Sequence, residues 1–213
     1  MDTSLILIII LSYLIGSISG GVIVGKFRNV DIREKGSKAA GATNAFRTMG
    51  IMFALMVVII DVYKGFFAAK YIPYFLNNSS IEMKLLAGVS CVIGHVYPLY
   101  FKFKGGKGIG TALGVCLVFP KLLPFILIAV FCWIFTLIIT GYVGLSSILA
   151  TLSIPLQYSL SNNSLYESLG IFSILVTVFI IFTHRENITR MLNGTENQFK
   201  KIMITNLFKK NNG

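Results

Sequence analysis

Charged residues are scarce in this chain of 213 residues: they make up 13% of it, and 8 acidic side chains stand against 19 lysines and arginines. With 55% hydrophobic residues and a mean hydropathy of +0.78, the composition excludes an ordinary soluble domain. Repeated apolar runs of about 17 to 22 residues predict α-helical membrane spans, because barrel strands are short and alternating. We therefore expect an all-α, polytopic membrane protein.

Cysteines and carboxylates are also few. Cys91, Cys116 and Cys132 lie inside apolar segments without paired spacing, so they indicate neither a disulfide framework nor a zinc site. The acids are scattered, which argues against a metal-dependent phosphotransferase. We predict no metal and no cofactor. The net charge of +11 is spread over short loops of a hydrophobic chain, which favours cytoplasmic loops over a nucleic-acid surface.

The apolar runs predict seven transmembrane helices in a single domain, residues 1–213. Asp2 precedes the first run without any lysine or arginine, so we expect a retained span and no cleaved signal peptide. The expected spans are roughly Ser4–Gly25, Met49–Tyr71, Lys84–Tyr100, Gly108–Phe119, Pro124–Thr140, Gly141–Tyr158 and Ser168–Thr183. The fourth is short, so it either continues through Lys121 or is a half-buried helix. Residues 196–213 are expected to form a basic cytoplasmic tail, either a frayed end or a weak interfacial helix with Phe199, Ile202, Met203, Leu207 and Phe208.

Lysines and arginines concentrate in three polar segments. Residues 26–47 hold six, residues 102–107 hold three and residues 184–213 hold six. With seven spans all three segments fall on one side, and only Lys84 and Lys121 fall on the other. The positive-inside rule then places the three segments in the cytoplasm and the N-terminus outside.

The stretch from His95 to Gly110 contains three lysines and four glycines between two apolar runs. Amide groups in the Gly105-Gly106 turn, the positive end of a helix beginning near Gly108, and lysine charges are all suited to an oxyanion. Lysines flanking a span often serve only as anchors at the membrane surface. The glycines favour the anion site, because anchoring needs no backbone freedom.

Three further polar groups accompany this stretch. Residues 26–47 carry hinge glycines and hydrogen-bonding side chains that suit a small polar ligand, although a solvated loop would explain the charges alone. Asp61 and Lys64 share a helix face inside a span, as either a functional pair or a structural ion pair. His184 and Asn187 share a face at the start of the tail, where a histidine also suits a helix end.

A cationic cytoplasmic pocket beside lipid suggests transfer between a phosphorylated alcohol and an apolar donor. Several familiar motifs are missing. The Walker A pattern fails because Phe101 stands at its first glycine and Gly108 follows Lys107. A histidine followed five positions later by aspartate is absent, since Tyr100 and Thr189 stand there, and no Gly-x-Ser-x-Gly elbow exists.

The chain resembles the bacterial membrane glycerol-3-phosphate acyltransferases that use acyl phosphate as donor, the PlsY family, nearly from end to end. Three motifs carry the resemblance, with Asp61-Val62-Tyr63-Lys64-Gly65 in support. They are Gly36-Ser37 with Gly41-Ala42-Thr43-Asn44 and Arg47, then His95 to Gly108, then His184-Arg185-Glu186-Asn187-Ile188 through Glu196.

The resemblance implies transfer of a fatty acyl group from acyl phosphate to the 1-hydroxyl of glycerol-3-phosphate, giving lysophosphatidic acid and phosphate in a bacterial cell membrane. It implies no metal and no covalent acyl-enzyme. Orientation and charge stabilisation would suffice, because acyl phosphate already carries a good leaving group. The implied catalytic residues are Ser37, Arg47, Lys107, His184 and Asn187. The implied substrate-binding residues are Thr43, Asn44, His95, Lys104, Gly105, Gly106 and Gly108.

The chain departs from the family pattern at Lys38-Ala39-Ala40, at Gly141 and Gly144, and at Ser19-Gly20. These changes leave open a diverged paralogue with altered substrate or a non-catalytic descendant. A transporter or binding protein for an organic phosphate is the second alternative, although no internal repeat is visible. The sequence leaves the oligomeric state and the acyl-chain preference open.

Overall fold

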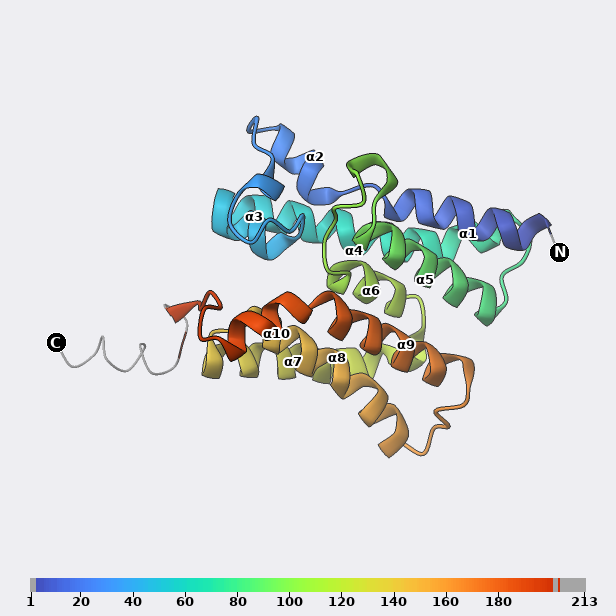
Figure 1. The fold of residues 1–213 in the computed structure, drawn as a ribbon. Helices are drawn as coiled ribbons and strands as arrows, with labels where there is room; N and C mark the ends of the chain where they lie inside the picture. The colour runs from blue at the N-terminus through green and yellow to red at the C-terminus, as the bar shows by residue number, and fades with distance from the viewer. Residues whose placement is uncertain (1–2, 201–202, 204–213) are drawn as a thin grey trace. The chain divides into compact units, whose positions relative to one another are not determined.

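The computed structural model describes residues 3–200 and 203, and within this range every regular element is helical, as predicted (Figure 1). The chain divides into two compact units with the boundary between Pro120 and Lys121. The expectation of a single domain remains a prediction. Ile202, Leu207 and Phe208 of the predicted tail lie outside the described residues.

The first unit is built on three long helices and several short ones. Helices α1, α4 and α5 contact one another, and α6 packs on α4 and α5. The elements are α1 Thr3–Gly16, α2 Gly20–Lys26, η1 Ile32–Glu34, α3 Ala42–Met49, α4 Ile51–Phe75, α5 Ile81–Val96, η2 Leu99–Phe101 and α6 Ile109–Cys116.

The first predicted span is broken in the structure. Helix α1 stops at Gly16, and α2 begins at Gly20 behind Ser19, whose side chain accepts a hydrogen bond from the Val22 amide at 3.4 Å. The small residue that ends α1 allows a close approach to α5. A Cβ atom on Gly16 would lie 2.1 Å from the Cys91 carbonyl oxygen of α5. The break itself was not predicted from the sequence.

Helices α4 and α6 approach each other through a glycine on each. A Cβ atom on Gly65 would lie 2.2 Å from the Thr111 carbonyl oxygen, and one on Gly114 would lie 2.0 Å from the Val62 carbonyl oxygen. Both neighbours are backbone atoms, so neither can rotate away. Close backbone contact of this kind supplies van der Waals attraction where lipid removes the hydrophobic driving force.

Replacing Gly65 by alanine is therefore expected to push α6 off α4. We expect overpacking of about 1–3 kcal/mol, which lowers the apparent melting temperature in detergent by about 5 °C. Gly41→Ala is the matched control, because a Cβ atom there meets nothing within 4 Å. Equal melting temperatures for the two variants would contradict the close α4–α6 contact.

The described part of the second unit contains four helices, preceded by a short helical turn that begins at the boundary residue Pro120. Helix α8 contacts α7, α9 and α10, and α10 also contacts α9. Gly141, with φ of 70°, closes α7, and α9 and α10 meet at His184 with a bend of 53°. The elements are η3 Pro120–Leu122, α7 Leu123–Thr140, α8 Val143–Leu160, α9 Ser168–Thr183 and α10 Arg185–Leu192.

Five helical stretches of the described residues are long and apolar enough to cross a membrane, and a sixth is added if the bent α9–α10 pair counts as one span. Large apolar side chains such as Ile59, Leu127 and Phe131 are exposed, as expected of lipid-facing helices. The fourth predicted span is not among the candidates, because α6 has only eight residues. The single stretches are Thr3–Lys26, Ile51–Phe75, Ile81–Phe101, Pro120–Thr140 and Val143–Leu160.

Candidate functional site

The loop before α3 is folded around the side chain of Asn44, which is 1% exposed. Its amide nitrogen donates to the carbonyl oxygens of Ile32, Lys35 and Ala39 at 2.6, 3.0 and 3.0 Å. Its oxygen accepts the Ser37 amide at 3.0 Å. Asn44 was predicted to bind substrate. In this structure its polar atoms are engaged with loop backbone, so they shape the loop that carries Ser37.

The tight fold of this loop explains one of its glycines. Gly36 has φ of +58°, and a Cβ atom on it would lie 2.2 Å from the Asn44 side-chain oxygen. Lys38, one of the departures from the family pattern, also has a positive φ, of 58°. Its side chain is exposed, so the added cation stands at the surface of the loop.

The Gly105-Gly106 turn lies against the end of α5 and against this loop. The Gly106 amide donates to the His95 carbonyl oxygen, and the Ala40 amide donates to the Gly105 carbonyl oxygen, both at 3.2 Å. A Cβ atom on Gly105 would lie 2.0 Å from the same His95 oxygen. The Gly106 amide is therefore used in the fold, and anion binding at the Gly105-Gly106 turn remains a prediction. The glycines are needed for room.

The remaining predicted groups of the first unit lie on these two connected segments. Thr43 and Arg47 are in the first and last turns of α3, and both are half-buried. Lys104 is exposed, Lys107 is half-buried, and Gly108 adopts φ of 90° immediately before α6, close to the predicted helix start. The hydrogen bond from Ala40 to Gly105 thus joins the segment that bears Arg47 to the segment that bears the two lysines.

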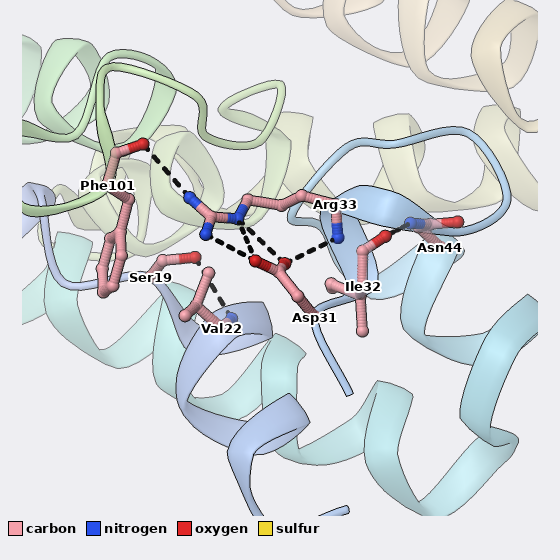
Figure 2. A network of polar contacts seen from close by, with 7 residues as sticks. All are labelled: Ser19, Val22, Asp31, Ile32, Arg33, Asn44 and Phe101. Atoms are coloured by element: carbon pink, nitrogen blue, oxygen red, sulfur yellow. Dashed lines mark hydrogen bonds and ion pairs between the residues drawn. The ribbon is translucent and has the colours of Figure 1, made fainter. Parts of the chain in front are cut away.

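An arginine that the sequence interpretation did not single out also connects these segments. Figure 2 shows Arg33 between the Asp31 carboxylate and the Phe101 carbonyl: Arg33 Nη2 donates to Asp31 Oδ2 at 2.6 Å, and Nη1 donates to the Phe101 oxygen at 3.1 Å. Hydrogen bonding to Arg33 lowers the pKa of Asp31 below its ordinary value, which keeps the pair ionised. The close spacing of an acid and an arginine in Asp31-Ile32-Arg33 was the sequence signal that could have indicated this ion pair.

A cavity of about 560 Å³ lies beside this arginine. Its walls combine apolar and charged side chains from α2, η1, η2 and the loop between α2 and η1. They are Val22, Lys26, Asn29, Val30, Asp31, Arg33 and Phe101. None of the residues predicted to be catalytic lines it.

His95 was predicted to bind substrate and is instead 5% exposed, in contact with Asp61 and Lys64. Its ring lies beneath Gly106, where a Cβ atom would stand 2.2 Å from Nε2. Asp61 and Lys64 form the predicted ion pair, with Lys64 Nζ 3.0 Å from Asp61 Oδ1.

In the second unit, His184 and Asn187 lie at the bend between α9 and α10 and are 3% and 5% exposed. His184 Nδ1 donates to the Ile180 carbonyl oxygen at 2.8 Å, so in the neutral ring Nε2 is the nitrogen that can accept a proton. The bond to Ile180 also matches the helix-end role that the sequence left open for this histidine.

Asn187 is held by a carboxylate. Its amide nitrogen donates to Glu196 Oε1 at 3.1 Å, and Arg190 Nε donates to Glu196 Oε2 at 2.7 Å. Glu196, the first residue of the predicted tail, is itself 8% exposed. A Cβ atom on Gly144 would lie 3.0 Å from the Asn187 side chain, so this departure from the family pattern gives Asn187 its room.

The described residues, 3–200 and 203, contain no group of three histidine, cysteine, aspartate or glutamate side chains placed to hold a metal ion. The expectation of a reaction without metal remains a prediction.

The fold and the two connected cationic segments define an integral membrane protein with a site suited to phosphate. Residues 6–194 match the family described as glycerol-3-phosphate acyltransferase. The chain belongs to this family, as its three motifs predicted.

Curated relatives carry the same description. The glycerol-3-phosphate acyltransferase of Bacillus subtilis (strain 168) is 47% identical over 195 residues, which cover 91% of this chain and 97% of the relative. That of Fusobacterium nucleatum is 40% identical over 193 residues, which cover 90% of this chain and 96% of the relative.

Two solved structures are similar to this chain, both crystal structures of PlsY (YgiH), an integral membrane glycerol 3-phosphate acyltransferase. The glycerol 3-phosphate form has a TM-score of 0.82 at 36% identity, covering 93% of this chain and 97% of that one. The lysophosphatidic acid form has a TM-score of 0.79 at 36% identity, covering 92% and 95%.

Proposed function

We propose that this chain transfers a fatty acyl group from acyl phosphate to the 1-hydroxyl of glycerol-3-phosphate, the first acylation of phospholipid synthesis. The observation that carries the proposal is the family match over residues 6–194, which includes every residue assigned to the site. The solved relatives described as glycerol 3-phosphate and lysophosphatidic acid forms support the same acceptor and product.

Cations of the first unit hold the phosphates. Arg47, Lys104 and Lys107 supply positive charge, and Arg47 can bind phosphate oxygens in a bidentate manner. Ser37 and Thr43 supply hydroxyl groups for the phosphate and the glycerol. The Ala40–Gly105 hydrogen bond supports this assignment, because it connects the segments that carry these side chains.

The reaction is an acyl substitution. The 1-hydroxyl oxygen attacks the carbonyl carbon of acyl phosphate, the new ester C–O bond forms, and the bond from that carbon to the phosphate oxygen breaks. The electron pair leaves with phosphate, and the hydroxyl proton is released. Because phosphate is a good leaving group, orientation and charge stabilisation account for the rate without an enzyme nucleophile or a metal.

His184 and Asn187 of the second unit are the other residues to which the resemblance assigns a catalytic role. The neutral His184 ring, with Nδ1 donating to Ile180, can accept a hydroxyl hydrogen at Nε2. The side-chain oxygen of Asn187 can accept a hydrogen bond, while its nitrogen is held by Glu196. Both groups therefore suit the glycerol hydroxyls, whereas the cations suit the phosphates.

We further propose that the chain crosses a bacterial plasma membrane seven times, with its N-terminus outside and the site loops in the cytoplasm. The charge asymmetry of the loops supports this orientation. An eight-residue helix rises only about 12 Å, so α6 needs its non-helical flanks and protein neighbours to complete the fourth crossing. Contact of α6 with α4 and α5 supports such a buried crossing.

The test is a product assay. Detergent-purified protein given palmitoyl phosphate and glycerol-3-phosphate is expected to form lysophosphatidic acid and inorganic phosphate in equal amounts, with or without EDTA. Uptake of labelled glycerol-3-phosphate into sealed vesicles tests the transporter alternative. Uptake without product would contradict the proposal, and product from a different phosphorylated alcohol alone would identify a diverged paralogue.

A further inference from the structure

Three ionisable side chains meet inside the first unit, where one of them, His95, lies against the Gly105-Gly106 turn. Asp61, Lys64 and His95 are 4%, 4% and 5% exposed. Lys64 Nζ lies 3.0 Å from Asp61 Oδ1 and 2.9 Å from His95 Nδ1, and the latter nitrogen lies 3.4 Å from the same aspartate oxygen. Burying three such groups is costly inside a membrane protein, so a specific contact must offset the cost.

Lys64 supplies that contact at the break in the first span. Its ammonium group donates to the carbonyl oxygens of Gly16 and Ile18, at 2.9 and 2.6 Å. Gly16 is the last residue of α1 and Ile18 lies between α1 and α2, so no continuing helix pairs these two carbonyls. Lipid offers no water to replace the missing partners. Lys64 therefore stabilises the break, and Asp61 balances its charge.

His95 extends the cluster to the Gly105-Gly106 turn. Because an ammonium group can only donate, the 2.9 Å contact makes His95 Nδ1 an acceptor and leaves the proton on Nε2. The ring edge with Nε2 faces Gly106, whose missing Cβ atom would stand 2.2 Å from it. The Gly106 amide donates to the His95 backbone oxygen at 3.2 Å. The orientation of the ring thus sets the position of the turn.

The same break fixes the other end of this loop. Ser17 Oγ, inside the break, accepts the Leu99 amide at 3.2 Å, and Tyr13 of α1 donates its hydroxyl to the Tyr97 carbonyl oxygen at 2.8 Å. Residues 97–106 are therefore held at the break and at His95, and Lys64 contacts both places.

We propose that Asp61, Lys64 and His95 are positioning residues that fix the turn bearing Lys104 and Lys107, and through the Ala40–Gly105 bond fix the loop that leads into α3, the helix that bears Arg47. This inference rests on the proposed function. A merely structural ion pair would stabilise the helices in general. The positioning role instead predicts that removing the pair lowers kcat and speeds hydrogen exchange chiefly in the turn.

The first test deletes the charged pair without leaving an unpaired charge. Asp61→Asn with Lys64→Met is expected to lower kcat at least tenfold and to speed amide hydrogen exchange in residues 97–108 at least tenfold. The control is Lys121→Met with Glu167→Gln, which deletes an exposed pair of the same 3.0 Å separation in the second unit. We expect the control to retain its kcat within twofold.

The second test uses the clash at Gly106, so that the inference stays testable if the pair deletion fails to fold. Gly106→Ala is expected to lower kcat at least tenfold. Adding His95→Asn should restore at least part of this loss, because asparagine keeps an acceptor near the Nδ1 position and lacks the Nε2 and Cε1 atoms nearest the added methyl group. His95→Leu, which removes the acceptor, should restore less.

Unchanged hydrogen exchange in residues 97–108 of the pair-deleted variant would overturn the proposal. Faster exchange spread equally over α1, α4 and α5 would also overturn it, because that result indicates a merely structural role. Failure of His95→Asn to improve Gly106→Ala would also overturn it. Hydrogen exchange does not depend on turnover, so an inactive wild-type protein would contradict the proposed function and still leave the positioning role measurable.

Discussion

Replacing Arg47 or Lys107 by alanine is expected to lower kcat/KM for lysophosphatidic acid formation at least about a hundredfold. The reason is that each removes a positive charge from the phosphates at a partly desolvated site, where such contacts stabilise developing negative charge. Product formation by the purified variants, normalised to folded protein, is the measurement. Arg47→Lys should recover only part of the loss, because lysine keeps the charge without the bidentate geometry.

Two other cations of the first unit provide matched controls. Lys102 is exposed in the same stretch as Lys107, and Arg28 lies over the Phe53 ring with its guanidinium carbon 4.7 Å from the ring centroid. Lys102→Ala and Arg28→Ala are expected to remain within about threefold of wild type, because exposed charges contribute little. If all four alanine variants lose the same activity, general charge and not a defined site is responsible.

Asn44→Asp is expected to have the second large effect, through the loop rather than through the substrate. The substitution keeps the shape of the side chain, but it replaces the donor that serves three carbonyl oxygens with an acceptor. A buried group left unpaired costs about 1–3 kcal/mol, so we expect a loss of about 3 kcal/mol or more and an apparent melting temperature about 10 °C lower. Product formation should fall with it, because the loop that carries Ser37 keeps the bond from the Ser37 amide to residue 44 and loses the other three.

The control for this variant is an asparagine with a single long contact. Asn163 Nδ2 lies 3.4 Å from the Ser161 carbonyl oxygen in the loop between α8 and α9, so Asn163→Asp should leave the melting temperature nearly unchanged. A melting temperature for Asn44→Asp equal to that of Asn163→Asp would show that the loop does not depend on this amide.

The sequence predicted the helical class and the family because both depend on local patterns. Long apolar runs identify helices by length alone, and the predicted span from Met49 to Tyr71 corresponds to α4, Ile51–Phe75. The three motifs identified the family because each combines several residues at fixed spacing. Neither signal requires knowledge of tertiary contacts.

The break in the first span and the use of its carbonyls could not be predicted in this way. Residues 17–19, Ser-Ile-Ser, contain neither a proline nor a charge that would end a helix, and the partner that stabilises the break, Lys64, lies 46 residues after Ile18. The sequence did place Lys64 with Asp61, since three residues separate them on one helix. It could not show that Lys64 also contacts His95 of α5.

The residues of the predicted site have different physical roles in the structure. Asn44 and His95 belong to the motifs, yet hydrogen bonds from distant backbone and side chains occupy their polar atoms. The Gly105-Gly106 turn was predicted to bind an anion through its amides, because glycine allows many backbone conformations. In the structure the two glycines allow a close approach to His95. Membership of a motif predicts that a residue matters, and only the contacts show how.

We infer that the loop shaped by Asn44 and the Gly105-Gly106 turn together make one phosphate-binding site. Titration of the purified protein with glycerol-3-phosphate, in the absence of acyl donor, tests it most directly. We expect saturable binding that inorganic phosphate competes away. Arg47→Ala and Asn44→Asp should each weaken it at least about tenfold, and Lys121→Met should retain it. Wild-type affinity in both Arg47→Ala and Asn44→Asp would contradict it.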